Sequence, residues 1–139
     1  MESFQALLHA DLVLCKKHFL AEIKTHNLTP GQPKILEYLA CHGPSPQKDI
    51  AKSCYIDKAT LSSILSVMEA TGTIERKTDE ADKRIKMIQL TDSGWRLARI
   101  LNDDFFKTEK AALTGFSEEE AEQFISYLKR VRNNLSSFE

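Results

Sequence analysis

The sequence has little of what disulfide-built and membrane-spanning proteins require. Its 139 residues include three cysteines, five glycines and four prolines. No apolar run approaches the roughly 18 residues that are needed to cross a bilayer. An odd number of irregularly spaced cysteines fits a reducing compartment, and the first residues lack the basic start and cleavage site of a signal peptide. We therefore expect a cytoplasmic protein that folds without disulfides and has no membrane partner.

Charge of one predominant sign and the common catalytic signatures are also missing. Lys and Arg number 19 against 20 Asp and Glu, so the net charge of −1 indicates no particular partner. There is no glycine-rich phosphate loop and no Gly-x-Ser-x-Gly motif. The four histidines are scattered through the first 42 residues, which is not the ligand spacing of a zinc site. We expect no enzyme activity, no cofactor and no metal ion.

What the sequence does contain is apolar residues spaced three and four apart, a pattern typical of amphipathic helices. The expected helices cover residues 3–26, 32–40, 47–53, 57–70, 92–113 and a last segment that begins with the capping box of Ser117 and Glu120. Pro46 is expected to open the third helix, because an N–H group in the first turn has no helical partner to lose.

Between the fourth and fifth of these helices the period changes to that of β-strands. Residues 73–77 and 85–90 are short β-prone runs separated by the charged stretch 78–84. They predict a two-stranded hairpin, and an isolated hairpin is unstable in water, so this one must pack on helices. We therefore expect a mainly α fold with one small β-hairpin.

Both ends of the chain carry apolar stripes that a short central unit cannot cover. Residues 8–23 supply one stripe, and residues 124–135 supply the other. A second copy of the chain would cover them, because two-fold dimers are the commonest soluble oligomers, and a helical monomer is the alternative. We expect residues 1–30 and 92–139 to form a helical dimerisation region and residues 31–91 to form a separate central domain.

The central domain has the element order of a winged helix-turn-helix: a helix, two short helices joined by a tight turn, and a charged hairpin. Residues 47–53 would cross the DNA backbone, and residues 57–71 would enter the major groove. The buried side of the helix over residues 57–71 is expected to consist of Ile64, Leu65, Val67 and Met68. The predicted DNA contacts are Lys58, Ala59, Thr60, Ser62, Ser63 and Ser66 in the helix and Lys83, Arg84 and Lys86 at the hairpin tip. Small hydroxyl side chains allow close approach to bases, and arginine is favoured in a narrow minor groove.

Several motifs add a more specific indication through their order and spacing. They are Leu28-Thr29-Pro30-Gly31-Gln32, the run from Met68 to Arg76, Asp82-Lys83-Arg84, and Ile88-Gln89-Leu90-Thr91-Asp92-Ser93-Gly94. Together they make the sequence resemble the MarR family of bacterial transcription regulators. The resemblance implies a cytoplasmic homodimer that binds a palindromic operator, usually as a repressor released by a small ligand or by oxidation.

The same resemblance implies roles for particular residues. Arg84 would insert into the minor groove, and Asp82 would support it. Many members have an arginine near the position of Ser63, so this sequence departs from the family there and direct recognition of guanine is in doubt. An effector, aromatic in some relatives, would bind between the dimer helices and the winged unit. The candidate lining residues are Phe19, Tyr38, Tyr55 and Trp95.

Two other interpretations stay open on the sequence alone. One is a redox-responsive regulator that uses a cysteine thiol. Cys15 lies on an apolar stripe and is expected to be buried and inert, whereas Cys41 and Cys54 flank the helix-turn-helix and are expected to be partly exposed. The other interpretation is a winged helix that binds proteins and not DNA.

Overall fold

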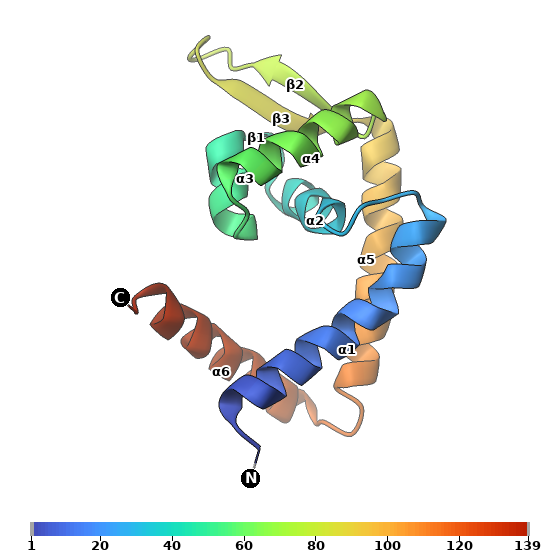
Figure 1. Cartoon of the computed structure of the whole chain (residues 1–139), viewed down its shortest axis with the longest axis vertical. Coiled ribbons are helices and arrows are strands. Elements are labelled where there is room, and N and C mark those ends of the chain that lie inside the picture. The colour runs from blue at the N-terminus through green and yellow to red at the C-terminus, as the bar shows by residue number, and fades with distance from the viewer. Residues whose placement is uncertain (1, 139) are drawn as a thin grey trace. The chain divides into compact units, whose positions relative to one another are not determined.

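The computed structural model describes residues 2–138, which divide into two compact units, one up to residue 105 and one from residue 106 onward. The elements in chain order are α1 (Phe4–Thr25), α2 (Gln32–His42), β1 (Ser45–Pro46), α3 (Gln47–Cys54), α4 (Lys58–Ala70), β2 (Ile74–Thr78), β3 (Lys86–Leu90), α5 (Asp92–Ala112) and α6 (Glu118–Ser136) (Figure 1). The first unit holds all three strands and the helices up to the middle of α5. The expectation of a mainly α chain with a small antiparallel sheet is confirmed.

Polar caps explain why most helices begin within a residue or two of the predicted positions. The Ser3 hydroxyl accepts a hydrogen bond from the Ala6 N–H group at the start of α1. Before α6, Ser117 and Glu120 form both hydrogen bonds of the predicted capping box, at 2.8 and 3.1 Å. Each bond satisfies an N–H group that has no carbonyl partner within the first helical turn.

The sheet corrects the sequence prediction, because it has three strands and not two. β1 pairs with β3 through Ser45 opposite Ile88, and β3 pairs with β2 in the hairpin, all antiparallel. Pro46 lies in β1 with an extended ψ of 152° and is also the N-cap residue of α3, which begins at Gln47 as predicted. A strand of two residues has no period from which it could be recognised.

The core of the first unit lies where the sheet, α2, α3 and α4 meet. Its fully buried side chains are Ile35, Leu36, Leu39, Ile50, Leu61, Leu65, Met68, Ile74 and Ile88. On α4 the buried side corrects the prediction, because Leu61 is buried whereas Val67 is 47% exposed. Residues 61, 65 and 68 lie on one helical face, and position 67 is turned about 100° from its neighbour 68.

A close backbone contact joins the end of the hairpin to α5. A Cβ atom on Gly94 would lie 2.1 Å from the Thr73 carbonyl oxygen, so only glycine fits this position. The Thr91 hydroxyl donates to the Gly72 carbonyl at 2.5 Å and accepts from the Gly94 N–H group at 3.1 Å. Thr91 and Gly94, which belong to the motif that runs from Ile88 to Gly94, therefore fix the start of α5 against the turn that leads into β2.

Many apolar side chains on α1 and α6 are exposed to solvent, as the sequence predicted for the two ends of the chain. In α1 only Ile23 is buried, and α6 has no buried residue. The exposed apolar side chains include Leu7, Leu8, Leu12, Val13, Leu14 and Leu20 on α1, and Phe124, Ile125, Leu128 and Leu135 on α6. Among the described residues, no helix has the length and the hydropathy needed to pass through a lipid bilayer.

Candidate nucleic-acid interface

The turn between α3 and α4 is short and closely fixed by the backbone. Tyr55 ends α3 in the left-handed region, with φ of 55° and ψ of 44°, and its N–H group donates to the Ala51 carbonyl. Asp57 then caps α4 by accepting from the Thr60 N–H group at 2.9 Å and from the Thr60 hydroxyl at 2.6 Å. These bonds lower the pKa of the Asp57 carboxyl, with the hydroxyl of Thr60 as the main cause. The first turn of α4 is thus set at a defined position after α3.

The face of α4 that points away from the core is exposed and carries small side chains. Lys58, Ala59, Thr60, Ser63 and Ser66, which are five of the six predicted contacts on this helix, are exposed. Ser62 is different, because it is half-buried and its hydroxyl accepts a hydrogen bond of 2.6 Å from the Gln47 side chain of α3. Five of the predicted contact residues are therefore exposed to solvent, while the Ser62 side chain is hydrogen-bonded to the preceding helix.

Gln47 also belongs to a polar network that the sequence did not reveal. Its side-chain oxygen lies 3.5 Å from Arg76 Nη1 on β2, and Arg76 Nε lies 3.4 Å from a carboxylate oxygen of Glu69 on α4. With Ser62 these residues form what we call the Gln47–Arg76 network, which joins α3, α4 and the hairpin. Contacts that span three elements leave no signal in sequence spacing.

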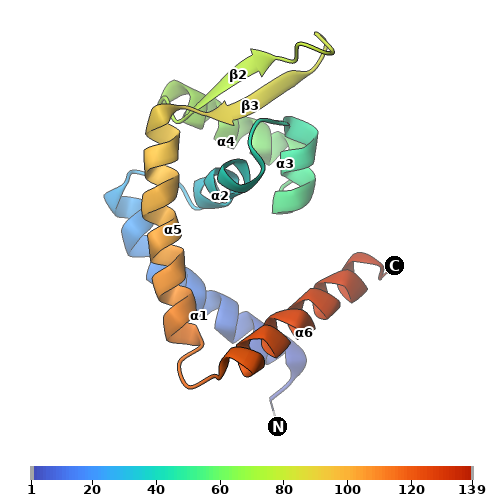
Figure 2. The same cartoon turned by 180° about the vertical axis from the view of Figure 1, so that it is seen from behind.

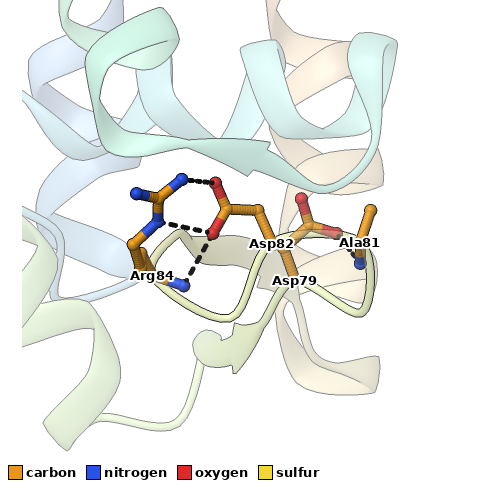
Figure 3. Close-up of polar contacts among 4 residues, drawn as sticks. All are labelled: Asp79, Ala81, Asp82 and Arg84. Carbon is orange, nitrogen blue, oxygen red and sulfur yellow. Dashed lines mark hydrogen bonds and ion pairs between the residues drawn. The ribbon is translucent and has the colours of Figure 1, made fainter.

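The hairpin loop holds the predicted arginine in a defined position. Asp82 accepts hydrogen bonds from the Arg84 N–H group and from Arg84 Nε, both at 3.0 Å, and from Arg84 Nη2 at 3.1 Å (Figure 3). The Arg84 side chain is nevertheless 90% exposed. Their contact lowers the pKa of the Asp82 carboxyl and raises that of Arg84, so both groups stay charged. Within the first unit, the loop projects away from the helices in both views (Figures 1 and 2).

Three further hydrogen bonds lie in or beside the same loop. The Asp79 carboxylate accepts from the Ala81 N–H group at 3.1 Å, and the Asp79 N–H group donates to the Ile85 carbonyl at 2.9 Å. Lys86 Nζ donates to the Thr78 hydroxyl across the hairpin at 3.0 Å, and Lys83 is exposed. The three predicted cations of the hairpin thus lie on or beside one loop, although only Arg84 is held by a carboxylate that faces it.

A cavity of about 520 Å³ lies between α2 and α5 in the first unit. It is lined by Glu37, Ala40, Cys41, Trp95, Ala98, Arg99, Leu101, Asn102, Asp103 and Phe105. Of the four predicted pocket residues, Trp95 lines this cavity directly. Phe19 packs edge-to-face on Phe105, a residue of the cavity wall, with the two ring centroids 4.7 Å apart. The polar and charged members of this wall were missed, because they are ordinary exposed positions in the helical pattern.

The other two predicted pocket residues lie elsewhere. Tyr38 stacks on His42 with a ring separation of 4.2 Å and is not among the residues that line the cavity. Tyr55 is 75% exposed at the turn between α3 and α4. The structure therefore brings Phe19 and Trp95 to the α2–α5 cavity but not the two tyrosines.

The three cysteines differ in exposure, and two predictions about them are wrong. Cys15 is partly exposed and not buried, because few side chains of the first unit cover α1 at that height. Cys54 is buried and not exposed, since it ends α3 on the core side with its thiol 3.7 Å from the Lys34 carbonyl. Burial raises the pKa of the Cys54 thiol. Cys41 is exposed, as expected.

Two helices joined by a tight turn, packed on a small sheet with a projecting hairpin, define a winged helix-turn-helix protein. The comparison with known families is more specific: the model of the MarR family matches residues 28–86. The chain is also 30% identical over 114 residues to YybA of Bacillus subtilis (strain 168), an uncharacterized HTH-type transcriptional regulator. The aligned region covers 82% of this chain and 76% of YybA.

Solved structures give the same result over nearly the whole chain. The transcriptional regulator SlyA is 28% identical with a TM-score of 0.85, covering 98% of this chain and 95% of SlyA. MepR of S. aureus in complex with DNA is also 28% identical, with a TM-score of 0.86 and 96% of each chain covered. The chain belongs to the MarR family of transcriptional regulators, which are not enzymes.

Proposed function

We propose that this protein is a sequence-specific DNA-binding regulator that acts as a homodimeric repressor on a palindromic operator. The observation that carries the proposal is Arg84, an exposed guanidinium held by Asp82 at the tip of a projecting loop. The solved complex of MepR with DNA, a similar chain, supports the same assignment. A protein that acts on cellular DNA in this way would work in the cytoplasm.

In this proposal the two parts of the winged unit contact different grooves. α4 enters the major groove with its first turns, where Lys58, Ala59 and Thr60 are exposed. Arg84 enters the adjacent minor groove, where the negative potential of a narrow groove favours a guanidinium. Lys83 and Lys86 flank it and neutralise phosphates, so binding is expected to weaken steeply with salt.

The uncovered apolar faces of α1 and α6 support the homodimer. Leu8 and Leu12 on α1 and Phe124 and Leu128 on α6 are each about 40–50% exposed, which leaves a large apolar area in water in a lone chain. A two-fold dimer would place two copies of α4 against half-sites about one helical turn apart, or a multiple of it, which explains a palindromic operator.

A small ligand is proposed to release the dimer from DNA by binding in the α2–α5 cavity. Trp95 and Phe105 provide aromatic surface there, and Glu37, Arg99 and Asp103 provide charge. An oxidant-responsive regulator is the second candidate, and the exposed Cys41 on the wall of this cavity is the observation that favours it. Cys54 is a poor candidate for that role, because a raised pKa leaves little thiolate at neutral pH.

The test is a titration of fluorescent duplexes that tile the region upstream of the encoding gene, at low and at physiological salt. One fragment should bind at least tenfold more tightly than random DNA of equal length. Light scattering should give about twice the 15.8 kDa of one chain, and Leu12→Glu should lower both the mass and the affinity. Equal affinity for every fragment would reject sequence-specific binding, and no binding to any fragment would favour a protein-binding winged helix. A monomeric wild type that still binds one fragment selectively would reject only the dimer.

A further inference from the structure

We infer that α4 recognises A·T base pairs, through methyl groups and hydroxyl oxygens that accept hydrogen bonds, and does not contact guanine directly. This inference rests on the proposed function, because it concerns the bases that α4 meets in the major groove. It follows from which hydrogen-bond donors the exposed face of α4 has left to offer.

The hydroxyl protons on the exposed face of α4 are already used within the protein. Ser63 donates to the Ala59 carbonyl at 3.2 Å, and Ser66 donates to the Ser62 carbonyl at 2.9 Å. Thr60 donates to the Asp57 carboxylate at 2.6 Å. Carbonyl and carboxylate oxygens only accept, so each hydroxyl must be the donor, and each of these exposed residues keeps a hydroxyl oxygen that can still accept.

Lys58 at the first position is the one remaining strong donor on this face, and we assign it to a phosphate and not to a base. Between residues 58 and 70 the sequence has no Arg, Asn or Gln, and Lys58 at the first position is the one basic residue. Ser62 is half-buried and is turned toward Gln47 of α3. What remains outward is the methyl group of Ala59 and the exposed side chain of Val67, next to hydroxyl oxygens.

The base pairs differ in which hydrogen-bonding and apolar groups they present to α4 in the major groove. Guanine offers only acceptors there, N7 and O6, and a side chain must donate to recognise them. An A·T pair offers the adenine N6 amino group, which donates, and the thymine methyl group, which packs on apolar side chains. Hydroxyl oxygens match the amino group, while Ala59 and Val67 match the methyl group. A cytosine amino group could also be bonded, but a G·C pair has no methyl group for the apolar side chains.

The first experiment selects bound duplexes from a randomised DNA library and sequences them. The enriched half-sites should contain A·T pairs at the positions that α4 covers. Uracil in place of thymine removes only the methyl group, and it should weaken binding about fourfold for each contacted position. Replacing guanine by 7-deazaguanine throughout the selected site removes the N7 acceptor in the major groove and should leave affinity unchanged.

A pair of matched variants assigns the effect to a residue. Ala59→Gly should remove most of the difference between thymine and uracil, whereas Ala70→Gly, the same change in the last turn of α4, should preserve it. Both changes cost similar helix stability, so thermal melting of the two variants controls for folding. Ser63→Arg introduces a donor, so a site selected anew with this variant should contain guanine under α4 and should lose affinity with 7-deazaguanine.

The outcomes separate this inference from the proposed function. A selection with no enriched sequence would reject sequence-specific binding itself. An enriched site that loses tenfold or more with 7-deazaguanine would leave the regulator intact and overturn the inference, because the wing lies in the minor groove and cannot contact N7. Equal binding of thymine and uracil duplexes by the wild type would overturn it as well.

Discussion

The carboxylate of Asp82 holds Arg84, two residues further along the same loop, through one backbone and two side-chain hydrogen bonds of 3.0 to 3.1 Å. Because both residues belong to the loop, the contact forms whether or not DNA is present. The guanidinium has therefore lost part of its conformational freedom before it meets a ligand, which lowers the entropic cost of binding.

Arg84→Ala is expected to weaken operator binding about 10- to 100-fold, the loss typical of one specific contact. The slope of log affinity against log salt should become shallower by about one unit, because one cation leaves the phosphates. Arg84→Lys should keep the slope but lose affinity, and Asp82→Ala should show a milder loss. Titrations at two salt concentrations measure all three. If Arg84→Ala binds as tightly as the wild type at both salt concentrations, the hairpin is not a DNA contact.

Ser63→Glu should abolish specific binding without unfolding the protein. The residue is exposed on the outer face of α4, where a carboxylate would meet phosphates and base acceptors. Ser63→Ala is the matched control and should lose far less affinity, because it removes one acceptor oxygen but introduces no charge. If Ser63→Glu binds the operator normally, this face of α4 does not enter the groove.

Gly94→Ala should destabilise the protein by about 3 kcal/mol, because its Cβ would lie 2.1 Å from a backbone oxygen that cannot move aside alone. Ser93→Ala, at the exposed neighbouring position, should change the free energy of unfolding by less than about 0.5 kcal/mol. Urea unfolding followed by circular dichroism compares the two variants. Similar midpoints for both would mean that the junction of the hairpin with α5 is looser than described.

Asp57 should make stability depend on acid pH. Its pKa is lowered in the folded protein by the Thr60 hydroxyl and N–H group, so the carboxylate stabilises the fold above its unfolded pKa of about 3.9. That stabilisation is lost as the pH falls through the lower folded value. Asp57→Ala should therefore melt a few degrees below wild type at pH 7, and the difference should shrink below about pH 4. A constant difference across this range would argue against the ionised cap.

The thiols should react in the order of their exposure. At pH 8, iodoacetamide should modify Cys41 first and Cys54 last, because Cys54 is buried and its pKa is raised. Quenching at intervals followed by peptide mass spectrometry gives the three rates, and urea should make them similar. Faster modification of Cys54 than of Cys41 in the native protein would show that α3 opens readily.

Local patterns in the sequence predicted much of the fold. Caps such as Asp57 and the Ser117–Glu120 box mark helix starts by hydrogen bonds within one turn, and both form as expected. The loop of Asp82 and Arg84 was equally accessible, since its contacts join residues two apart. Information of this kind is local in the chain, so one sequence is enough to reveal it.

Features that depend on distant partners were missed or misplaced. β1 exists because Ser45 finds Ile88 across the sheet, and nothing at position 45 signals that partner. Val67 is as apolar as Leu61, yet packing leaves it exposed. Tyr55 is aromatic but occupies a turn that faces solvent. In each case tertiary packing, and not local preference, determines where the side chain lies.

The Gln47–Arg76 network has a consequence for how this protein could change during evolution. Three contacts between side chains, from Gln47 to Ser62 and from Arg76 to both Gln47 and Glu69, join the first helix of the pair, α4 and the hairpin. A substitution at Gln47 or Glu69 would remove a contact that positions the hairpin against α4 while leaving Ala59, Ser63 and Arg84 unchanged. The distance between the two groove contacts could then drift, and new operators could be acquired without altering any residue that touches a base.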